Sequence, residues 1–226
     1  MNATNLFAIL GTIFSIYINF SPLILFIQVL KKKESIDILP QRLLFCQIAD
    51  RILWGSIWIL KSQLIPLINC LICIIIIASF IMAYFYLYYH RAFFNAFIRF
   101  LILLGIIYFI FLRIIIYGNI SVISFFALLF SLFIYIAQIK ETIKVIKEKD
   151  HYLIRIDIAI AGIICFCSWA IFGKYINYIP QIIINIIGLL ISLINAIAWI
   201  YLYYKRDKLK NKEEEKVTIV RNKGNK

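Results

Sequence analysis

Residues 86–89 read YLYY, and the same four letters return at residues 201–204, an offset of 115. Trp54 and Trp169 are separated by the same 115 positions, and Ile65-Pro66 returns as Ile179-Pro180 at an offset of 114. Each repeat unit is almost entirely apolar. The chain therefore reads as a duplicated membrane bundle with one extra helix between the copies. Internal repeats in a membrane protein indicate a transporter whose substrate site lies at the repeat interface.

The composition points to a lipid environment. Hydrophobic residues make up 64% of the 226 positions, and the mean hydropathy is +0.94. A soluble domain of this length cannot bury so much apolar surface, so the lipid bilayer is the expected partner of most of the chain. The formal net charge of +13 lies between the apolar runs and in the C-terminal tail, so we expect no nucleic-acid partner.

The sequence carries no pattern typical of catalysis or of a bound cofactor. Its five cysteines lie inside apolar runs, where thiols act as small hydrophobic side chains, and they lack the flanking ligands that a metal site needs. No carboxylate pair, Ser-His-Asp set or glycine-rich phosphate loop is present. We therefore expect the protein not to be an enzyme, and we expect no cofactor and no metal.

The apolar runs predict seven transmembrane helices, because about 20 apolar residues cross the hydrocarbon core of a bilayer. The expected fold is an all-α membrane protein with two parallel three-helix bundles joined by a linker helix. The expected units are a first bundle at 1–92, linker helix 4 at 93–118, a second bundle at 119–205, and a charged, disordered cytoplasmic tail at 206–226. The expected spans are 5–30, 40–60, 64–89, 95–116, 119–140, 153–173 and 178–204.

Lysine and arginine are unequally distributed between the two sides of these spans. With the N-terminus outside, twenty fall in the cytoplasmic connections and the tail, and three, Lys61, Arg113 and Lys174, fall outside. This bias agrees with seven spans, an outside N-terminus and a cytoplasmic C-terminus, and six or eight spans would scramble it. The choice between plasma membrane and endomembrane stays open, as does the possibility of a homo-oligomer.

Polar residues recur at helical spacing in two of the predicted spans. Because lipid-facing surface should be uniformly apolar, such stripes mark faces turned inward, either toward a pore or ligand or toward another helix. In the second span, Asp50 lies near mid-membrane, where an unpaired charge costs at least about 2.5 kcal/mol, so it needs a partner such as Arg51 or Arg113. A structural ion pair and a proton-coupling carboxylate are both open. The two stripes are Gln47, Asp50, Trp54, Trp58 and Lys61, and then Gln181, Asn185, Gly188, Ser192, Asn195 and Trp199.

Two tryptophans and several amides facing one cavity suit a sugar, because its C–H faces stack on indole and its hydroxyls need donors and acceptors. The first span contains Ser21-Pro22-Leu23 followed by the basic stretch 31–35, KKKES. In the second half, residues 169–173 read WAIFG and residues 185–188 read NIIG. In this order and spacing, the motifs resemble those of the SWEET sugar-transporter family, seven-helix facilitators built as 3+1+3 bundles, over about residues 5–205.

The resemblance implies bidirectional facilitated diffusion of mono- or disaccharides by alternating access. It implies that Trp169 and Asn185 contact the sugar, together with their repeat-one partners Trp54 and Asn69. The Asn69 assignment differs by one residue from the repeat, because an offset of 115 pairs Asn185 with Cys70.

The family also places a proline in each of four helices, where a missing hydrogen bond lets the helix bend. Pro22 occupies the first of these positions, and Pro40, three residues before the second, is a candidate replacement hinge. Arg155 beside Asp157 is a candidate ion-pair gate at the inner end. The three positions that lack the proline are Leu43, Gln138 and Arg155.

Three other functions remain open. A PQ-loop-type carrier of amino acids, proton-coupled, or a cargo receptor of that type finds a superficial match in Pro180-Gln181 and would use Asp50. A seven-helix ligand receptor has the same topology but predicts no internal repeat. A non-transporting scaffold is suggested by the missing prolines.

Overall fold

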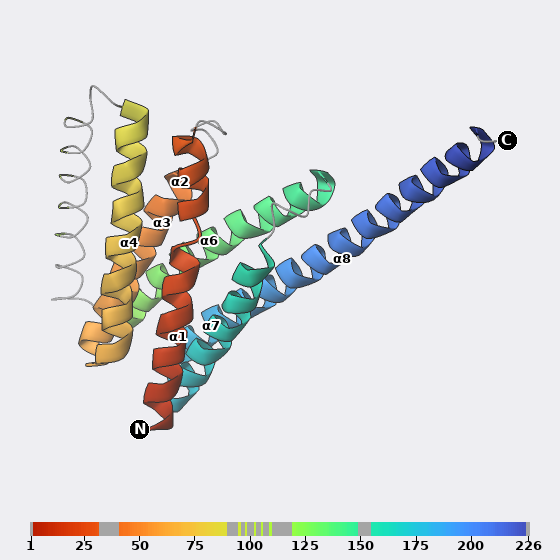
Figure 1. Ribbon diagram of the computed structural model, residues 1–226. Helices are drawn as coiled ribbons and strands as arrows, with labels where there is room; N and C mark the ends of the chain where they lie inside the picture. Colours follow the sequence, from red (N-terminus) through yellow and green to blue (C-terminus); the bar gives the residue numbers. More distant parts are fainter. Residues whose placement is uncertain are drawn as a thin grey trace.

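A computed structural model of the chain describes residues 2–31, 41–89, 119–148 and 155–224, together with five single positions between 95 and 109. All regular structure within these ranges is helical (Figure 1). The helices are α1 (Ala3–Asn19), α2 (Leu23–Leu30), α3 (Gln41–Leu60), α4 (Leu64–Tyr89), α6 (Ile120–Glu148), α7 (Ile156–Tyr175) and α8 (Ile179–Gly224).

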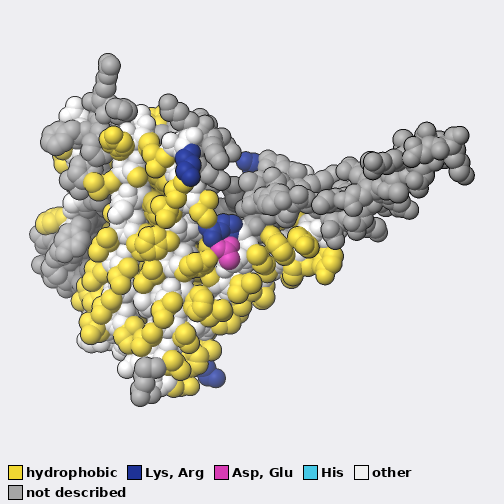
Figure 2. All heavy atoms as spheres, in the orientation of Figure 1, with side chains coloured by type: hydrophobic (Ala, Val, Ile, Leu, Met, Phe, Trp, Pro, Cys, Tyr) yellow, Lys and Arg dark blue, Asp and Glu magenta, His cyan; other side chains and the backbone are white. Residues whose placement is uncertain are grey.

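Lipid solvation explains the all-helical fold. In hydrocarbon every backbone N–H and C=O must be satisfied within its own segment, and a helix does this. Five of the described helices are long and apolar enough to cross a bilayer. Hydrophobic side chains also cover much of the surface seen in Figure 2. The prediction of an all-α membrane fold is confirmed, while linker helix 4 at 95–116 lies outside the described residues except for the single positions given above.

The first predicted span, 5–30, is divided in two. Helix α1 ends at Asn19 and α2 begins at Leu23, with Phe20, Ser21 and Pro22 between them. Pro22 has no N–H to continue the ladder, and its ring clashes with the preceding turn, so the helix breaks where this residue stands. The expected span 5–30 is therefore made of two helices that meet at Pro22.

The last helix is longer than predicted. Helix α8 runs from Ile179 to Gly224, so it continues through residues 206–224. Lys, Glu and Arg, which dominate this segment, are good helix formers, and the membrane-spanning turns before it remove the cost of starting a new helix. In Figure 1 this end of α8 projects beyond the other helices.

The six long helices of the described part form a closed ring of packed pairs. Around the ring the order is α1, α7, α8, α6, α3, α4 and back to α1. Exchanging α1 with α6, α3 with α7 and α4 with α8 leaves the set of pairs unchanged. The packing therefore has an approximate two-fold repeat, with α1–α7 and α3–α6 as the equivalent contacts between the two halves.

The two helix-to-helix turns at the N-terminal end of the bundle repeat this symmetry in their backbone. Ser62 has a φ of 53° and Asn177 a φ of 50°, both in the left-handed region, at an offset of 115. The next residue in each turn donates its N–H five positions back. Gln63 N–H bonds the carbonyl of Trp58 at 3.0 Å, and Tyr178 N–H bonds that of Gly173 at 2.9 Å. The internal repeat thus extends to individual hydrogen bonds.

Candidate functional site

A central cavity of about 70 Å³ lies between the two halves of the ring. It is smaller than the roughly 300–1,000 Å³ of ordinary ligand pockets, so the two halves are drawn together around it. Residues from α1, α3, α4, α6, α7 and α8 line it. They are Ser15, Asp50, Arg51, Trp54, Trp58, Asn69, Cys70, Ser131, Tyr135, Cys165, Phe166, Trp169, Gln181, Ile184 and Asn185.

The cavity brings together the four residues predicted to contact substrate, Trp54, Asn69, Trp169 and Asn185. Its wall also follows the repeat, because five pairs of lining residues are separated by 115 positions. The one-residue ambiguity at Asn69 disappears in space, since both members of each neighbouring pair line the cavity. The five pairs are Asp50 and Cys165, Arg51 and Phe166, Trp54 and Trp169, Asn69 and Ile184, and Cys70 and Asn185.

The two predicted indoles are buried inside the bundle, each with 5% of its surface exposed. Trp54 donates its Nε1–H to the hydroxyl of Ser131 at 3.2 Å, which ties α3 to α6. Trp169 lies against the backbone of Gly11, so close that a Cβ on Gly11 would be 2.7 Å from the ring. The Cys165 thiol, one turn before Trp169, approaches the Gly11 carbonyl oxygen at 3.5 Å. Only glycine at position 11 lets α1 come this close to α7.

An aromatic cluster closes the cavity toward the turns at 61–63 and 176–178. Trp58 stacks on Trp54 at a centroid distance of 5.9 Å and meets Phe172 edge-on at 5.9 Å and Tyr178 at 5.8 Å. Trp169 meets Phe172 at 5.5 Å. The rings from α3, α7 and the second turn thus form one continuous layer that connects the two predicted indoles.

The two predicted amides are buried, and each already makes a hydrogen bond within the protein. Asn185 donates to the carbonyl of Gln181 at 2.6 Å, which leaves its oxygen as an acceptor. Asn69 accepts the Cys73 thiol at 3.5 Å, which leaves its NH₂ group as a donor. One amide therefore offers an acceptor and the other a donor to whatever enters the cavity.

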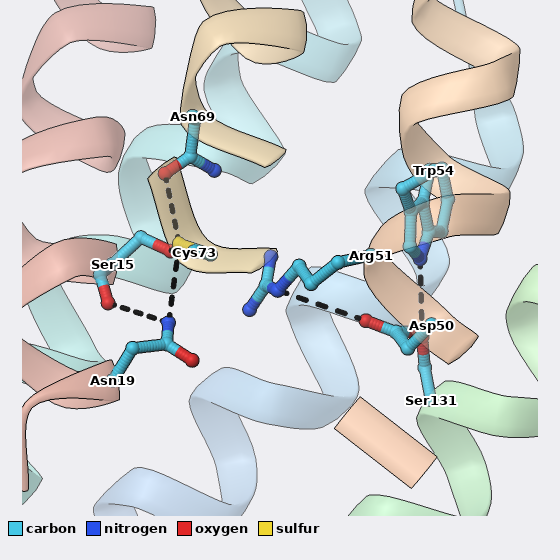
Figure 3. A network of polar contacts seen from close by, with 8 residues as sticks. All are labelled: Ser15, Asn19, Asp50, Arg51, Trp54, Asn69, Cys73 and Ser131. Carbon is cyan, nitrogen blue, oxygen red and sulfur yellow. Dashed lines mark hydrogen bonds and ion pairs between the residues drawn. The ribbon is translucent and has the colours of Figure 1, made fainter. Parts of the chain in front are cut away.

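Asp50 has two partners. Its carboxylate accepts the Ser131 hydroxyl and lies 4.0 Å from Arg51 Nε (Figure 3). Arg51, the neighbouring residue, is therefore in contact with it, whereas the other predicted partner, Arg113, lies outside the described residues. Within the described part of the chain, buried Arg51 Nε has no hydrogen-bond acceptor.

The predicted hinge and gate residues lie away from the cavity. Pro22 marks the break between α1 and α2, whereas Gln138 lies inside unbroken α6, and Pro40 is outside the described residues. Arg155, just before α7, bonds Asp157, and its Nε–Oδ1 distance is 3.2 Å. This bond raises the pKa of the Arg155 guanidinium above its ordinary value.

A third residue joins this ion pair. Tyr17 donates its hydroxyl to Asp157 at 2.6 Å, so the cluster connects α1 to α7 across the two halves. It is a surface cluster, because 43% of the Asp157 side chain is exposed. The predicted ion pair is therefore present, and its role as a gate stays a proposal.

The polar stripe on α8 serves two purposes. Gln181 and Asn185 line the cavity, whereas the later residues pack against other helices. A Cβ at Gly188 would be 2.6 Å from the Tyr135 hydroxyl, and Asn195 lies 2.5 Å from the Thr142 hydroxyl. Both readings of the stripe, ligand face and packing face, thus hold for different parts of it.

Several lining residues were not among the predicted site residues. The spacing of four between Trp54 and Trp58 was a usable signal for the second indole. Adding the repeat offset of 115 to Asp50 and Arg51 gives Cys165 and Phe166. For Ser131 the signal is weaker, because it matches Ser15 only at an offset of 116.

Residues 121–209 match the family model described as a sugar efflux transporter for intercellular exchange. This part of the second half is therefore similar to the SWEET sugar-transporter family. This match confirms the resemblance inferred from the WAIFG and NIIG motifs, both of which lie inside it. No curated protein matches the chain in sequence.

The fold of this chain is also found among solved structures. The 3.7 Å structure of a eukaryotic SWEET transporter matches it with a TM-score of 0.78, covering 89% of this chain and 97% of the other. The sequence identity is 11%, so this likeness is evidence for the fold alone. It confirms the predicted seven-helix fold class.

Proposed function

We propose that the chain is a facilitative carrier that moves mono- or disaccharides in both directions across a membrane by alternating access. Similarity to a sugar-transporter family rests on the match of residues 121–209. The observation that supports facilitated transport is the central cavity, whose wall repeats at an offset of 115 and includes Trp54, Asn69, Trp169 and Asn185.

The chemistry of the wall suits a sugar. Trp54 and Trp169 offer apolar faces on which the C–H side of a pyranose can stack. Asn69 contributes donors and Asn185 an acceptor, as their existing hydrogen bonds leave them. Ring hydroxyls need both kinds of group once they leave water, since an unpaired buried polar group costs about 1–3 kcal/mol.

The motion we propose is a rocking of the first bundle, 1–92, against the second, 119–205, with the segment 93–118 as the link. The break at Pro22 is the proposed hinge in the first bundle. Tyr17, Arg155 and Asp157 form the proposed gate, since their contacts cross between α1 and α7. The charge bias favours an N-terminus outside and a tail in the cytoplasm.

Counterflow of radiolabelled glucose and sucrose in proteoliposomes tests the proposal. Wild-type protein should exchange at least one of the two sugars, and the double variant Trp169→Ala with Asn185→Ala should lose most of this flux. Trp199→Ala, which removes a tryptophan that does not line the cavity, is the matched control and should keep it. Absence of wild-type flux for both sugars contradicts the carrier, and full flux in the double variant contradicts the assigned pocket.

The proton-coupled alternative has one observation in its favour, the buried carboxylate of Asp50 in the cavity wall. Its hydroxyl and guanidinium partners favour a structural role, because they satisfy the ionised form. Uptake measured with and without an imposed pH gradient distinguishes proton-coupled from facilitative transport. The facilitative proposal expects no accumulation driven by the gradient.

A further inference from the structure

The cavity wall is chemically unequal on its two sides. In the first repeat it carries Asp50 and Arg51, and at the equivalent positions of the second repeat it carries Cys165 and Phe166. A wall for a neutral sugar needs no fixed charge, and a charge inside a bilayer is costly to place. The pair therefore requires an explanation beyond the shape of the cavity.

The Asp50 carboxylate does not accept a hydrogen bond from Arg51 Nε. The nearest carboxylate oxygen lies 4.0 Å from Arg51 Nε, beyond hydrogen-bond distance, and the carboxylate is held instead by the Ser131 hydroxyl. No acceptor for the buried Nε is found among the described residues. A guanidinium has five N–H donors, and Arg51, which lines the cavity, keeps at least its Nε–H for a ligand.

The surroundings of the guanidinium add a further donor for a ligand. Figure 3 shows it between the Asp50–Ser131 pair on one side and the group of Asn69, Cys73 and Asn19 on the other. Within that group the Asn69 oxygen already accepts the Cys73 thiol, so its NH₂ is the part left for a ligand. A ligand group that contacts both Arg51 and Asn69 therefore fits best when it has only hydrogen-bond acceptors.

We propose that the preferred substrate is a sugar that bears a carboxylate, and that the Arg51 guanidinium binds this group. This inference rests on the proposed carrier function and narrows its substrate class. Arginine matches a carboxylate with two parallel N–H···O bonds, and the indoles of Trp54 and Trp169 remain available for the sugar ring. A phosphate monoester fits less well, because its charge of roughly −1.5 to −2 is larger than that of a carboxylate and would face the same single guanidinium beside Asp50.

Competition against labelled glucose counterflow tests the proposal on the wild-type protein. Glucuronate should inhibit at a concentration at least about tenfold below that of unlabelled glucose, since a hydrogen bond to a charged group is worth a tenfold factor or more. The methyl ester of glucuronic acid, which keeps the ring and loses the charge, should be no better than glucose. Equal inhibition by glucuronate and its ester overturns the proposal, as does stronger inhibition by glucose 6-phosphate than by glucuronate.

Arg51→Gln should abolish the preference for glucuronate, and Arg51→Lys should keep part of it. Lys174→Gln removes one positive charge at an exposed position of α7 and should leave the preference intact. A preference that survives in Arg51→Gln overturns the assignment of the carboxylate to this residue. If the Arg51→Gln protein does not fold, the ester comparison on the wild type still decides.

Binding separates this inference from the carrier itself. Quenching of the intrinsic tryptophan fluorescence by glucuronate, with no effect of the ester, supports the site even where no flux is found, and in that case the carrier proposal fails. Glucose flux without any advantage for glucuronate has the opposite meaning, because the carrier stands and the carboxylate inference fails.

Discussion

Substitution of Gly11 by alanine tests how closely α1 and α7 must approach to form the cavity. In the structure an added Cβ would lie 2.7 Å from Trp169 Cε2, 2.8 Å from Nε1 and 2.9 Å from Cδ2. Ordinary contacts between such atoms are about 3.5–4.0 Å, so either the indole or the whole helix must move by roughly 1 Å. Both movements alter the wall of the proposed sugar site.

The expected loss of stability follows from two opposing effects. Overpacking a well-packed interior costs typically about 1–3 kcal/mol. Replacing glycine with alanine inside a helix gains about 0.5–1 kcal/mol. Gly55→Ala is the matched control, because its Cβ would meet only the Cys70 Cβ, at an ordinary 3.5 Å. The difference between the two variants therefore isolates the contact with Trp169, at about 1–3 kcal/mol.

Thermal unfolding in detergent measures this difference, with about 2–4 °C expected per kcal/mol for a chain of this size. Glucose counterflow of the same two variants should show a higher half-saturation concentration for Gly11→Ala and an unchanged one for Gly55→Ala. Equal melting temperatures and equal half-saturation in the two variants would refute the close α1–α7 contact and the position of Trp169 in the wall.

Two further substitutions test contacts that cross between the halves. Ser131→Ala removes the hydroxyl that donates to Asp50 and should lower the free energy of unfolding, measured by thermal melts, by about 1–3 kcal/mol. Ser56→Ala is the control, because it breaks a hydrogen bond only within its own helix and should lower this free energy less. An equal loss in the two serine variants speaks against an inter-helix role for Ser131. Tyr17→Phe breaks the bond to exposed Asp157 and should leave the melting temperature nearly unchanged while a membrane-permeant maleimide labels the cavity cysteines faster. Unchanged labelling speaks against a gate.

The sequence predicts the fold well because the solvent leaves few choices. Apolar runs such as Leu64–Tyr89 have to be helices in lipid, and the offset of 115 relates the two halves before any coordinates are known. The same offset identified Trp54 and Trp169, and both line the cavity. The ends of the helices were harder to predict. The break at Pro22 and the continuation of α8 after Lys205 depend on whether a helix already formed extends into the next segment.

The remaining wall residues could not be predicted from pattern alone. Tyr135 and Ser131 come from α6, whose apolar sequence gives little sign of which face meets α3. Their position depends on the register between two helices that are far apart in the chain, with Ser131 at a sequence distance of 81 from Asp50. Phe166 is likewise an ordinary apolar residue in the sequence, and only the repeat shows that its position is equivalent to that of Arg51.

The contacts that cross between the halves indicate how the proposed carrier opens. A cavity of about 70 Å³ is too small for a sugar, so the α1–α7 and α3–α6 contacts must loosen for loading. At α3–α6 the link is the chain from Trp54 through Ser131 to Asp50, all at the cavity itself. At α1–α7 the links are the exposed Tyr17–Asp157 bond near the break at Pro22 and the weak contact of the Cys165 thiol with the Gly11 carbonyl. Opening at the exposed contact breaks fewer buried hydrogen bonds, so we expect the α1–α7 side to separate first and the polar chain beside Arg51 to hold until substrate replaces part of it.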